Sequence, residues 1–569
     1  MIETSQTDFG RAQWRDVLLI LTVALCASLI MLGQGPLAGT EAQRAITAHQ
    51  MVQSGDWMVP RLLDHLYLAK PPLHCWIIAT FETLSGRADP FIWRLPSAIA
   101  GALTASVLYL IAARWYGRLG GLVAGISSFG LLALWAQNHT AELDALNTTA
   151  CISCACLLLD LGFGPRRHRG WIILAVAFSF SAALLLKGPA GLAPIIGALI
   201  GPAIFNRTLS HLKTPAPWIG LAAGTVVFLI YAWCAARHFH ALNLEPDTSG
   251  VLEAYANIFA DRIKNLGHNL VQPIELFLYA LPVSLCLPLA LNPAVWNESN
   301  DPEIARKWND ADRRLLRGLV GTIVVALVLT MLPGLVHPRY SYVWLPMICP
   351  VAGAIAAAWS RGMFVGNLNQ RAKEVFATTA VMFSVATVAI ALLAYQRDHQ
   401  NKIVLLFLAS LVSIIVCRGC LQLIKKNHFR AAGWATIALI LLAALPFAVY
   451  SVADRNKRSM FVAAQALAAK LPPHQTVATG NLVLNDPALF YYARLNVESH
   501  PDLDCRPREF TDSRWVVLDK VEYHNWSASL SDRLLNVQEI ESPDGPIYLA
   551  WYAAPSDAVA ADAQFSAGK

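Results

Sequence analysis

Ionisable side chains in this sequence gather in connections between long apolar runs. One connection, residues 35–93, contains Glu41, and another, residues 138–144, contains Glu142 and Asp144 without a lysine or arginine. A positioned carboxylate can act as a general base toward a hydroxyl nucleophile. We therefore predict Glu41 and Asp144 as catalytic residues and Glu142 as a substrate-binding residue.

Polar residues that suit a phosphate occur near the same connections and in a third one, residues 237–272. Ammonium groups and guanidinium forks both pair well with a phosphate dianion. We expect the carboxylates and cations to gather at a lipid head group. The predicted substrate-binding set contains Lys70, Lys187, Arg262, His268, Arg339 and Tyr342. Each cation has an alternative role as an anchor at the membrane interface.

Local helix chemistry gives an alternative account of both catalytic carboxylates. Thr40 and Gln43 have the spacing of a capping box, and Glu41 in a first helical turn suits the helix dipole. Asp144 opens an apolar run, where a carboxylate can cap a helix. Carboxylates near a membrane are functional hypotheses by default, so both residues stay in the predicted site.

The composition shows what kind of molecule must position these residues. Of 569 residues, 56% are hydrophobic and only 14% are charged, and the mean hydropathy is +0.45. Soluble globular proteins carry about 25% charged residues. This deficit excludes a soluble enzyme, a nucleic-acid-binding module and a disordered protein. The net charge of +6 forms no nucleic-acid patch, because the cations lie in short loops.

Apolar runs long enough to cross a bilayer define the predicted fold. We expect an all-α polytopic membrane protein of about thirteen transmembrane helices, followed by a small α/β domain. The predicted spans are 16–34, 94–113, 119–137, 145–163, 170–186, 189–205, 217–236, 273–292, 315–336, 342–359, 374–395, 403–424 and 432–452. Residues 70–86 are expected to lie in the interface plane instead.

Lysine and arginine in the short loops set the predicted orientation. If residues 70–86 do not span, the cluster of Arg166, Arg167 and Arg169 falls in the cytoplasm. The predicted domains are then a transmembrane domain, 1–452, with in-plane helices in its 35–93 connection, and a periplasmic α/β domain, 453–569. In the latter we predict a helix at 460–470 and strands at 476–479, 515–519 and 547–551. The expected location is the inner (plasma) membrane, crossed many times.

Several motifs resemble a known family. They are SGDWMVPRL at 54–62, KPPL at 70–73, RLPS at 94–97, LD at 143–144 and KGP at 187–189. Together they resemble the aminoarabinose transferase and protein mannosyltransferase type of polyprenol-phosphate-dependent glycosyltransferases, families 39 and 83. The resemblance covers the membrane region to about residue 360 and extends loosely beyond it.

The resemblance implies a C-type glycosyltransferase fold and a reaction. Such enzymes move a sugar from undecaprenyl phosphate or another polyprenyl phosphate to lipid A, a protein or a glycan on the periplasmic face. Asp144 corresponds to the family's second acidic residue, Glu41 to the Glu of an Asp-Glu pair, and Lys70 to the phosphate-binding Lys. The implied partners are this donor, one such acceptor and membrane lipids, without nucleic acid.

Three positions depart from the family pattern. Thr40 replaces the Asp of the pair, Ala69 replaces the Glu before Lys-Pro-Pro, and Arg44 replaces a Tyr. We include Arg44 in the predicted substrate-binding set. The resemblance implies a divalent metal to which that Glu contributes. Because Ala69 has no ligating atom, the sequence assigns no cofactor and leaves the metal open.

Two mechanisms and two other functions remain open at this point. A hydroxyl acceptor needs Glu41 or Asp144 as a base, whereas an ionised phosphate acceptor needs none. The losses at Thr40 and Ala69 favour a non-catalytic membrane protein that binds or carries lipid-linked sugar. The interpretation as an ion channel or transporter has less support. Such a pathway usually needs buried ionisable groups in mid-span, and the mid-span positions of this sequence are nearly free of charge.

Overall fold

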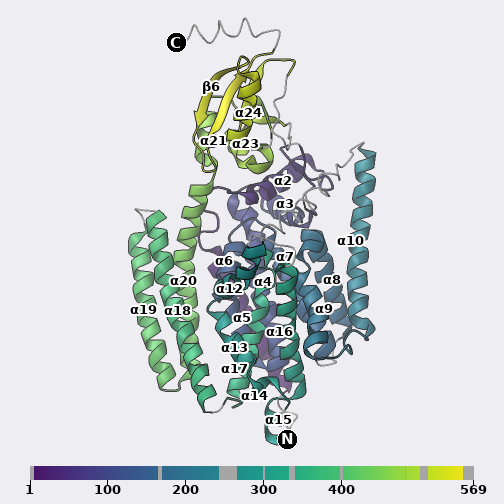
Figure 1. Ribbon diagram of the computed structural model, residues 1–569, viewed down its shortest axis with the longest axis vertical. Coiled ribbons are helices and arrows are strands. Elements are labelled where there is room, and N and C mark those ends of the chain that lie inside the picture. Colours follow the sequence, from purple (N-terminus) through teal and green to yellow (C-terminus); the bar gives the residue numbers. More distant parts are fainter. Residues whose placement is uncertain are drawn as a thin grey trace. The chain divides into compact units, whose positions relative to one another are not determined.

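The computed structural model is mostly helical, with one mixed sheet near the C-terminus (Figure 1). It describes residues 6–63, 65–68, 70–164, 169–242, 266–298, 301–331, 340–364, 366–397, 402–480, 482–499 and 510–554. The contacts divide the chain into two compact units. Unit 1 comprises Met1–Leu32, Ala69–His74 and Arg94–Ser451, and unit 2 comprises Gly33–Leu68, Cys75–Trp93 and Val452–Lys569.

Unit 1 is built from α-helices and short 3-10 turns. The α-helices are α1 (Gln6–Leu29), α4 (Pro90–Tyr116), α5 (Arg118–Ser127), α6 (Leu132–Asn138), α7 (Asp144–Phe163), α8 (Arg169–Lys187), α9 (Ala193–Phe205), α10 (Pro215–Ala241), α12 (Leu266–Tyr279), α13 (Leu287–Ala290), α14 (Pro293–Trp296), α15 (Pro302–Lys307), α16 (Asp310–Met331), α17 (Ile348–Ser360), α18 (Asn367–Arg397), α19 (Ile403–Lys425) and α20 (Phe429–Arg458). The 3-10 turns are η1 (Ser128–Gly130), η2 (Gly188–Gly191), η3 (Val283–Cys286) and η5 (Leu345–Met347). Helix α8 packs against both α7 and α10, and α9 packs against α16 (Figure 1).

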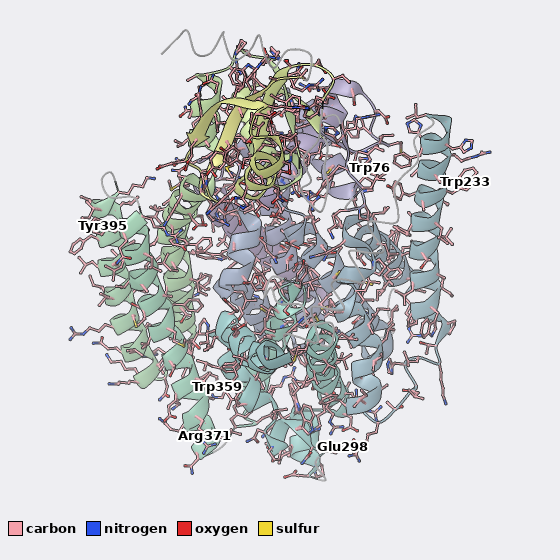
Figure 2. All side chains as sticks on the ribbon, turned by 45° about the horizontal axis from the view of Figure 1, so that its top comes forward. Trp76, Trp233, Glu298, Trp359, Arg371 and Tyr395 are labelled. Atoms are coloured by element: carbon pink, nitrogen blue, oxygen red, sulfur yellow. The ribbon has the colours of Figure 1, made fainter. Side chains whose placement is uncertain are left out.

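Within the described residues, eight helices are long and apolar enough to cross a membrane, or nine if one bent pair is a single span. The eight are Pro90–Tyr116, Asp144–Phe163, Arg169–Lys187, Pro215–Ala241, Asp310–Met331, Asn367–Arg397, Ile403–Lys425 and Ala431–Ala468. Large side chains such as Trp233 on α10 and Tyr395 on α18 point outward and are 59% and 40% exposed (Figure 2). The chain is a polytopic membrane protein.

The predicted count of thirteen is higher because hydropathy does not show where a helix breaks. The run at 119–137 is divided by η1, and the run at 273–292 is bent by 108°. In the runs at 189–205 and 342–359 the α-helices are α9 and α17, each of 13 residues, and a 3-10 turn precedes each of them. The first run, 16–34, overlaps α1. The polytopic helical fold is confirmed, and the count of thirteen stays a prediction.

Ion pairs with buried carboxylates and more exposed arginines join helices on one face of unit 1. The pairs are Asp16 with Arg118, Asp160 with Arg114, and Asp312 with Arg361, at N···O distances of 2.6, 3.0 and 3.0 Å. Because α7 begins at Asp144 and ends just beyond Asp160, the end that carries Asp144 is opposite this basic face. The positive-inside rule favours a cytoplasmic position for the basic face, in line with the predicted orientation.

Unit 2 combines part of the first connection with the C-terminal segment. Its elements are α2 (Thr40–Ser54), β1 (Arg61–Leu62), β2 (His65–Leu66), α3 (Leu73–Ser85, which begins in unit 1), α21 (Phe461–Ala468), β3 (Thr476–Thr479), α22 (Leu482–Asn485), α23 (Pro487–Ala493), β4 (Asn496–Ser499), β5 (Arg514–Leu518), α24 (Lys520–Leu530), β6 (Leu534–Ile540) and β7 (Ile547–Tyr552). The sheet order is β4-β3-β5-β7-β6, with β3 parallel to β4 and β5, and β7 antiparallel to β5 and β6. The predicted strands coincide with β3, β5 and β7, and the predicted helix contains α21.

A buried carboxylate holds the first-connection part of unit 2 together. Glu82 of α3 is 5% exposed and accepts hydrogen bonds from His49 Nδ1 at 2.6 Å and from Trp93 Nε1 at 2.7 Å. Tyr491 of α23 packs against both rings, with centroid distances of 6.1 Å to His49 and 6.2 Å to Trp93. Most of the 35–93 connection and the C-terminal segment therefore form one compact unit.

Helix α3 buries polar residues as well as apolar ones. His74 and Glu82 are 1% and 5% exposed, like the apolar Ile78 at 0%, whereas Leu84 is 81% exposed. The in-plane position of residues 70–86 stays a prediction.

Removing Asp160 should destabilise unit 1. Asp160 is 3% exposed and accepts hydrogen bonds from Arg114 Nε at 3.0 Å and Trp115 Nε1 at 2.8 Å. Asp160→Ala leaves a partly buried guanidinium without its carboxylate, so we expect a loss of about 3 kcal/mol in the free energy of unfolding. Thermal unfolding in detergent, followed by tryptophan fluorescence, measures it. As a control, Glu303→Ala breaks an exposed pair with Lys307 and should cost less than about 1 kcal/mol. Equal losses in the two variants would contradict this prediction.

The stability of the mixed sheet should depend on the protonation of Asp486. Burial, together with the nearby carboxylates of Asp544 and Asp519, raises the pKa of Asp486 from 3.8 to about 6. A raised carboxyl pKa means that the folded state binds the proton more tightly, so this stabilisation is lost as the pH rises through about 6. Asp486→Asn should therefore increase the hydrogen-exchange protection of β3 and β5 at about pH 8, with little gain at about pH 4.

Asp512→Asn is the matched control for this pH dependence. A hydrogen bond from Arg514 lowers the pKa of the exposed Asp512, so its contribution has the opposite sign and is present at neutral pH. Asp512→Asn should give no gain in protection at about pH 8. A gain from Asp486→Asn that did not change with pH would show that Asp486 acts through packing alone.

Candidate functional site

Asp144 and Lys187, two residues of the predicted site in unit 1, form an ion pair. Asp144 is the first residue of α7 and Lys187 is the last residue of α8, and the two helices run antiparallel. Lys187 Nζ donates to Asp144 Oδ1 at 2.6 Å, and the two side chains are only 8% and 14% exposed. The structure therefore brings these two predicted residues together.

The sequence after α8 explains why Lys187 lies at a helix end. Gly188 has a φ of +65°, a left-handed conformation that favours glycine. Pro189 then lies in the first turn of η2, where its missing N–H costs no hydrogen bond. The KGP motif thus ends α8 and leaves the lysine side chain beside Asp144.

An aromatic ring completes the surroundings of Lys187. Its Nζ lies 5.3 Å from the ring centroid of Tyr340, a cation–π distance. Tyr342, the predicted substrate-binding residue, instead packs against Tyr279 with centroids 6.0 Å apart. Sequence reasoning missed Tyr340, although it is adjacent to the predicted Arg339, because spacing alone does not show which tyrosine faces the lysine.

The RLPS motif has a structural role in unit 1. Arg94 is fully buried and its Nη1 donates to the carbonyl of Leu32 at 3.1 Å. Ser97 Oγ donates to the carbonyl of Glu142 at 3.1 Å. The motif therefore fixes the 138–144 connection, which carries Glu142 and leads into Asp144.

Glu41 and Arg44 lie one helical turn apart on α2 in unit 2. Glu41 is 1% exposed, and its Oε1 accepts a hydrogen bond from the backbone N–H of Ala38 at 3.0 Å. This contact shows the helix-start role that the sequence left as an alternative. The N-cap residue is Gly39, so Thr40 is the first residue of α2 and not its cap.

Arg44 is a buried cation with aromatic and hydroxyl neighbours. It is 6% exposed, its Nη1 donates to Tyr67 Oη, and its guanidinium carbon lies 5.2 Å from the Tyr67 ring centroid. Tyr67 Oη in turn donates to Gln43 Oε1 at 2.9 Å. Within the part of the chain that the structure describes, Arg44 forms no ion pair with a carboxylate, and its Nε has no hydrogen-bond partner. A buried charge without a partner is costly, so Arg44 suits contact with an anion.

The structure places the other predicted residues less completely. Lys70 is half-buried and precedes α3. Arg262 and Arg339 lie outside the described residues, and His268 lies in α12 with its side chain outside them. These three stay sequence predictions.

The residues present do not form a metal site. Within the described ranges, no group of three or more His, Cys, Asp or Glu side chains is placed to hold a metal ion. Ala69, which replaces the Glu implied by the resemblance, offers no ligand atom. We therefore assign no step of the reaction to a metal.

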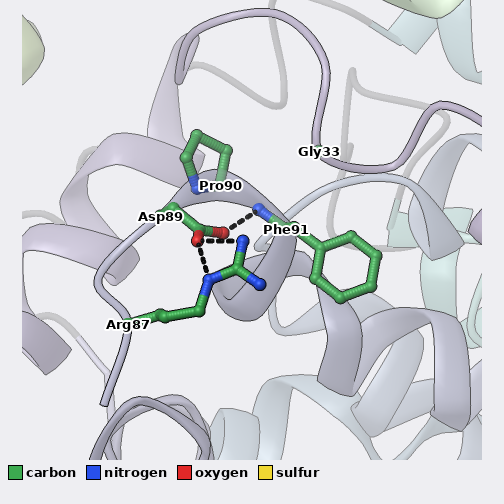
Figure 3. A pocket seen from close by; sticks show the side chains of 5 residues that line it. All are labelled: Gly33, Arg87, Asp89, Pro90 and Phe91. Carbon is green, nitrogen blue, oxygen red and sulfur yellow. Dashed lines mark hydrogen bonds and ion pairs between the residues drawn. The ribbon is translucent and has the colours of Figure 1, made fainter. Parts of the chain in front are cut away.

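A hollow of about 460 Å³ in unit 2 has no predicted site residue in its lining. Its lining residues are Gly33, Arg87, Asp89, Pro90 and Phe91 (Figure 3). Arg87 Nη2 and Asp89 Oδ2 are 2.7 Å apart, and Asp89 also accepts a hydrogen bond from the backbone N–H of Phe91 at 3.0 Å. The charged groups of this hollow therefore pair with each other, and Asp89 also binds a backbone N–H in the first turn of α4. We assign the hollow no function.

Known proteins are similar to this chain in sequence. Residues 69–233 match the family model described as dolichyl-phosphate-mannose-protein mannosyltransferase. The undecaprenyl phosphate-alpha-4-amino-4-deoxy-L-arabinose arabinosyl transferase of Erwinia tasmaniensis is 25% identical over 420 residues, 71% of each chain. The enzyme of the same name from Aeromonas salmonicida is 28% identical over 267 residues, so this match covers only 45% of each chain.

Solved structures show the same fold. ArnT from Cupriavidus metallidurans, determined bound to undecaprenyl phosphate and in the apo state, matches with TM-scores of 0.65 and 0.66. Both matches have 16% sequence identity and cover 94% of this chain and 97% of ArnT. The resemblance predicted from the sequence is confirmed: this chain is similar to the aminoarabinose transferase and protein mannosyltransferase type of membrane glycosyltransferase and has the ArnT fold.

Proposed function

We propose that this chain transfers a sugar from a polyprenyl phosphate to an acceptor on the periplasmic face of the inner membrane. The donor class follows from the related enzymes, which use undecaprenyl phosphate-linked aminoarabinose. The acceptor is lipid A, a protein or a glycan. The observation that carries the proposal is the buried pair of Asp144 and Lys187, 2.6 Å apart, in a chain with the ArnT fold.

The reaction exchanges one bond at the anomeric carbon for another. An acceptor oxygen forms the new bond to this carbon, while the bond to the phosphate oxygen breaks and the polyprenyl phosphate leaves with the electron pair. Preorganised positive charge lowers the barrier where negative charge develops. Lys187 and Lys70 supply this charge, and Asp144 holds Lys187 Nζ until the phosphate binds.

The acceptor decides whether a base is needed. A hydroxyl acceptor must lose a proton, and Asp144 or Glu41 then takes it. An ionised phosphate acceptor already carries a negative charge and has no proton to lose. The carboxylates then only position neighbouring side chains. Glu41 binds the backbone N–H of Ala38, which favours a positioning role for it. Asp144, at the end of α7 that we predict to face the periplasm, is the stronger candidate for the base.

Replacing either member of the ion pair should abolish most of the activity. The assay uses the full-length chain in nanodiscs with undecaprenyl phosphate-linked aminoarabinose and lipid A, and mass spectrometry of the acceptor. We expect Asp144→Asn and Lys187→Gln each to lower kcat by about a hundredfold or more. Each single variant also leaves one buried polar partner unsatisfied, so the double variant should be more stable than the sum of the single losses predicts.

Lys307→Gln, in an exposed pair far along the sequence, is the control and should transfer normally. Full transfer by both Asp144→Asn and Lys187→Gln would refute the proposed roles. A wild-type chain that binds undecaprenyl phosphate-linked aminoarabinose and transfers nothing to lipid A, protein or glycan acceptors would instead support the carrier function that Thr40 and Ala69 favour.

Arg44 should recognise an anionic group of a substrate. Because its buried charge has no carboxylate partner among the described residues, Arg44→Gln should raise KM about tenfold for the substrate whose anion it binds, without a loss of stability. Arg44→Lys keeps the charge, so its KM should lie between that of the wild type and that of Arg44→Gln. Tyr67→Phe, which keeps the ring and loses the hydroxyl, controls for the local contact. A KM that is unchanged in Arg44→Gln, with a lower unfolding temperature, would show a purely structural role.

A further inference from the structure

Asn147 is a buried polar residue that the mechanism above does not use. It lies in α7 three residues after Asp144, and its side chain is 1% exposed. Its Oδ1 accepts a hydrogen bond from Cys151 Sγ at 3.6 Å, whereas its Nδ2 has no partner among the described residues. A buried donor without a partner costs about 1–3 kcal/mol. An apolar side chain of similar size would therefore give a more stable bundle.

The Asn147 amide packs against the turn that carries Lys187. A Cβ atom on Gly191 would lie 2.9 Å from both Nδ2 and Oδ1 of Asn147, so the amide fills the space that a side chain would need. The single S–H of Cys151 is shared between this amide oxygen and the carbonyl of Gly191, to which its Sγ is closer, at 3.2 Å. Gly191 ends η2, which directly follows Lys187. The amide thus lies between α7 and the end of α8.

Helix geometry brings the same amide close to Asp144. Residues three apart on a helix share one face, and Cα–Cβ bonds tilt toward the helix N-terminus. The Asn147 side chain therefore leans toward the turn that contains Asp144. Its Nδ2 is a neutral donor on the same face of α7 as Asp144, whose partner in the ion pair, Lys187, carries a charge.

The two donors suit two states of the site. Lys187 holds Asp144 in the structure described here, but the leaving phosphate needs the same ammonium group. A phosphate dianion attracts an ammonium more strongly than a single carboxylate does. When Lys187 turns to the phosphate, Asp144 loses this donor. A neutral amide can take its place without adding a charge that would compete with the phosphate.

We propose that Asn147 is a positioning residue, whose Nδ2 donates to the Asp144 carboxylate when a lipid phosphate draws Lys187 away. This inference rests on the proposed function, because it requires a phosphate at Lys187. It explains why a buried donor is retained without a partner in the absence of substrate.

The test combines kinetics with a readout that needs no transfer. Asn147→Leu and Asn147→Ala should fold, bind undecaprenyl phosphate as tightly as the wild type, and lower kcat about tenfold with KM unchanged. Asn147→Ser, which keeps a small donor, should recover part of kcat. The second readout is the infrared difference spectrum recorded on addition of undecaprenyl phosphate. The Asp144 carboxylate band is identified by its absence in Asp144→Asn. The frequency of this band should differ between the Asn147 variants and the wild type.

Asn138→Ala is the matched control. Asn138 is also buried, its Oδ1 has no partner among the described residues, and it packs against Gly101 at the end of α6. Its replacement should leave kcat and the Asp144 band unchanged. A normal kcat and an unchanged Asp144 band in folded Asn147→Ala or Asn147→Leu would overturn the proposal. An absence of transfer by the wild type would count against the proposed function alone, because the infrared comparison still tests Asn147.

Discussion

The buried contact between the Asp144 carboxylate and the Lys187 ammonium is the constraint on which the site depends. At 14% and 8% exposure, each of these charges needs a partner to offset the loss of water. The pair in turn requires that α7 begins where α8 ends, with Gly188 and Pro189 ending α8 directly after the lysine. The antiparallel packing of the two membrane helices therefore brings a carboxylate and an ammonium group together where α7 begins and α8 ends.

The class of fold could be predicted from composition and apolar runs, whereas the lengths of the helices could not. The strands at 476–479 and 547–551 were predictable because short apolar runs stand between turn residues. The runs at 119–137 and 273–292 look continuous by hydropathy, yet one is divided and the other bent by 108°. Such breaks depend on how neighbouring helices pack, and hydropathy averages over them.

The residues of the site were predictable as types and positions, but their contacts were not. Asp144 and Lys187 both stood in the predicted set, and only the structure pairs them. The predicted set contained Tyr342, whereas the ring beside the lysine is that of Tyr340. Asn147 was missed altogether, because an asparagine in an apolar run gives no signal until its burial and its unpartnered donor are known.

The bond of Glu82 to His49 and Trp93, covered by Tyr491, has a consequence for the architecture of the chain. The C-terminal segment is not a detachable appendage. A chain that ends at Ser451 would lack Tyr491. The Glu82 carboxylate and the His49 and Trp93 rings bound to it would then be exposed to water. Insertions and fusions in this protein are therefore better tolerated beyond the sheet than between membrane helix and sheet.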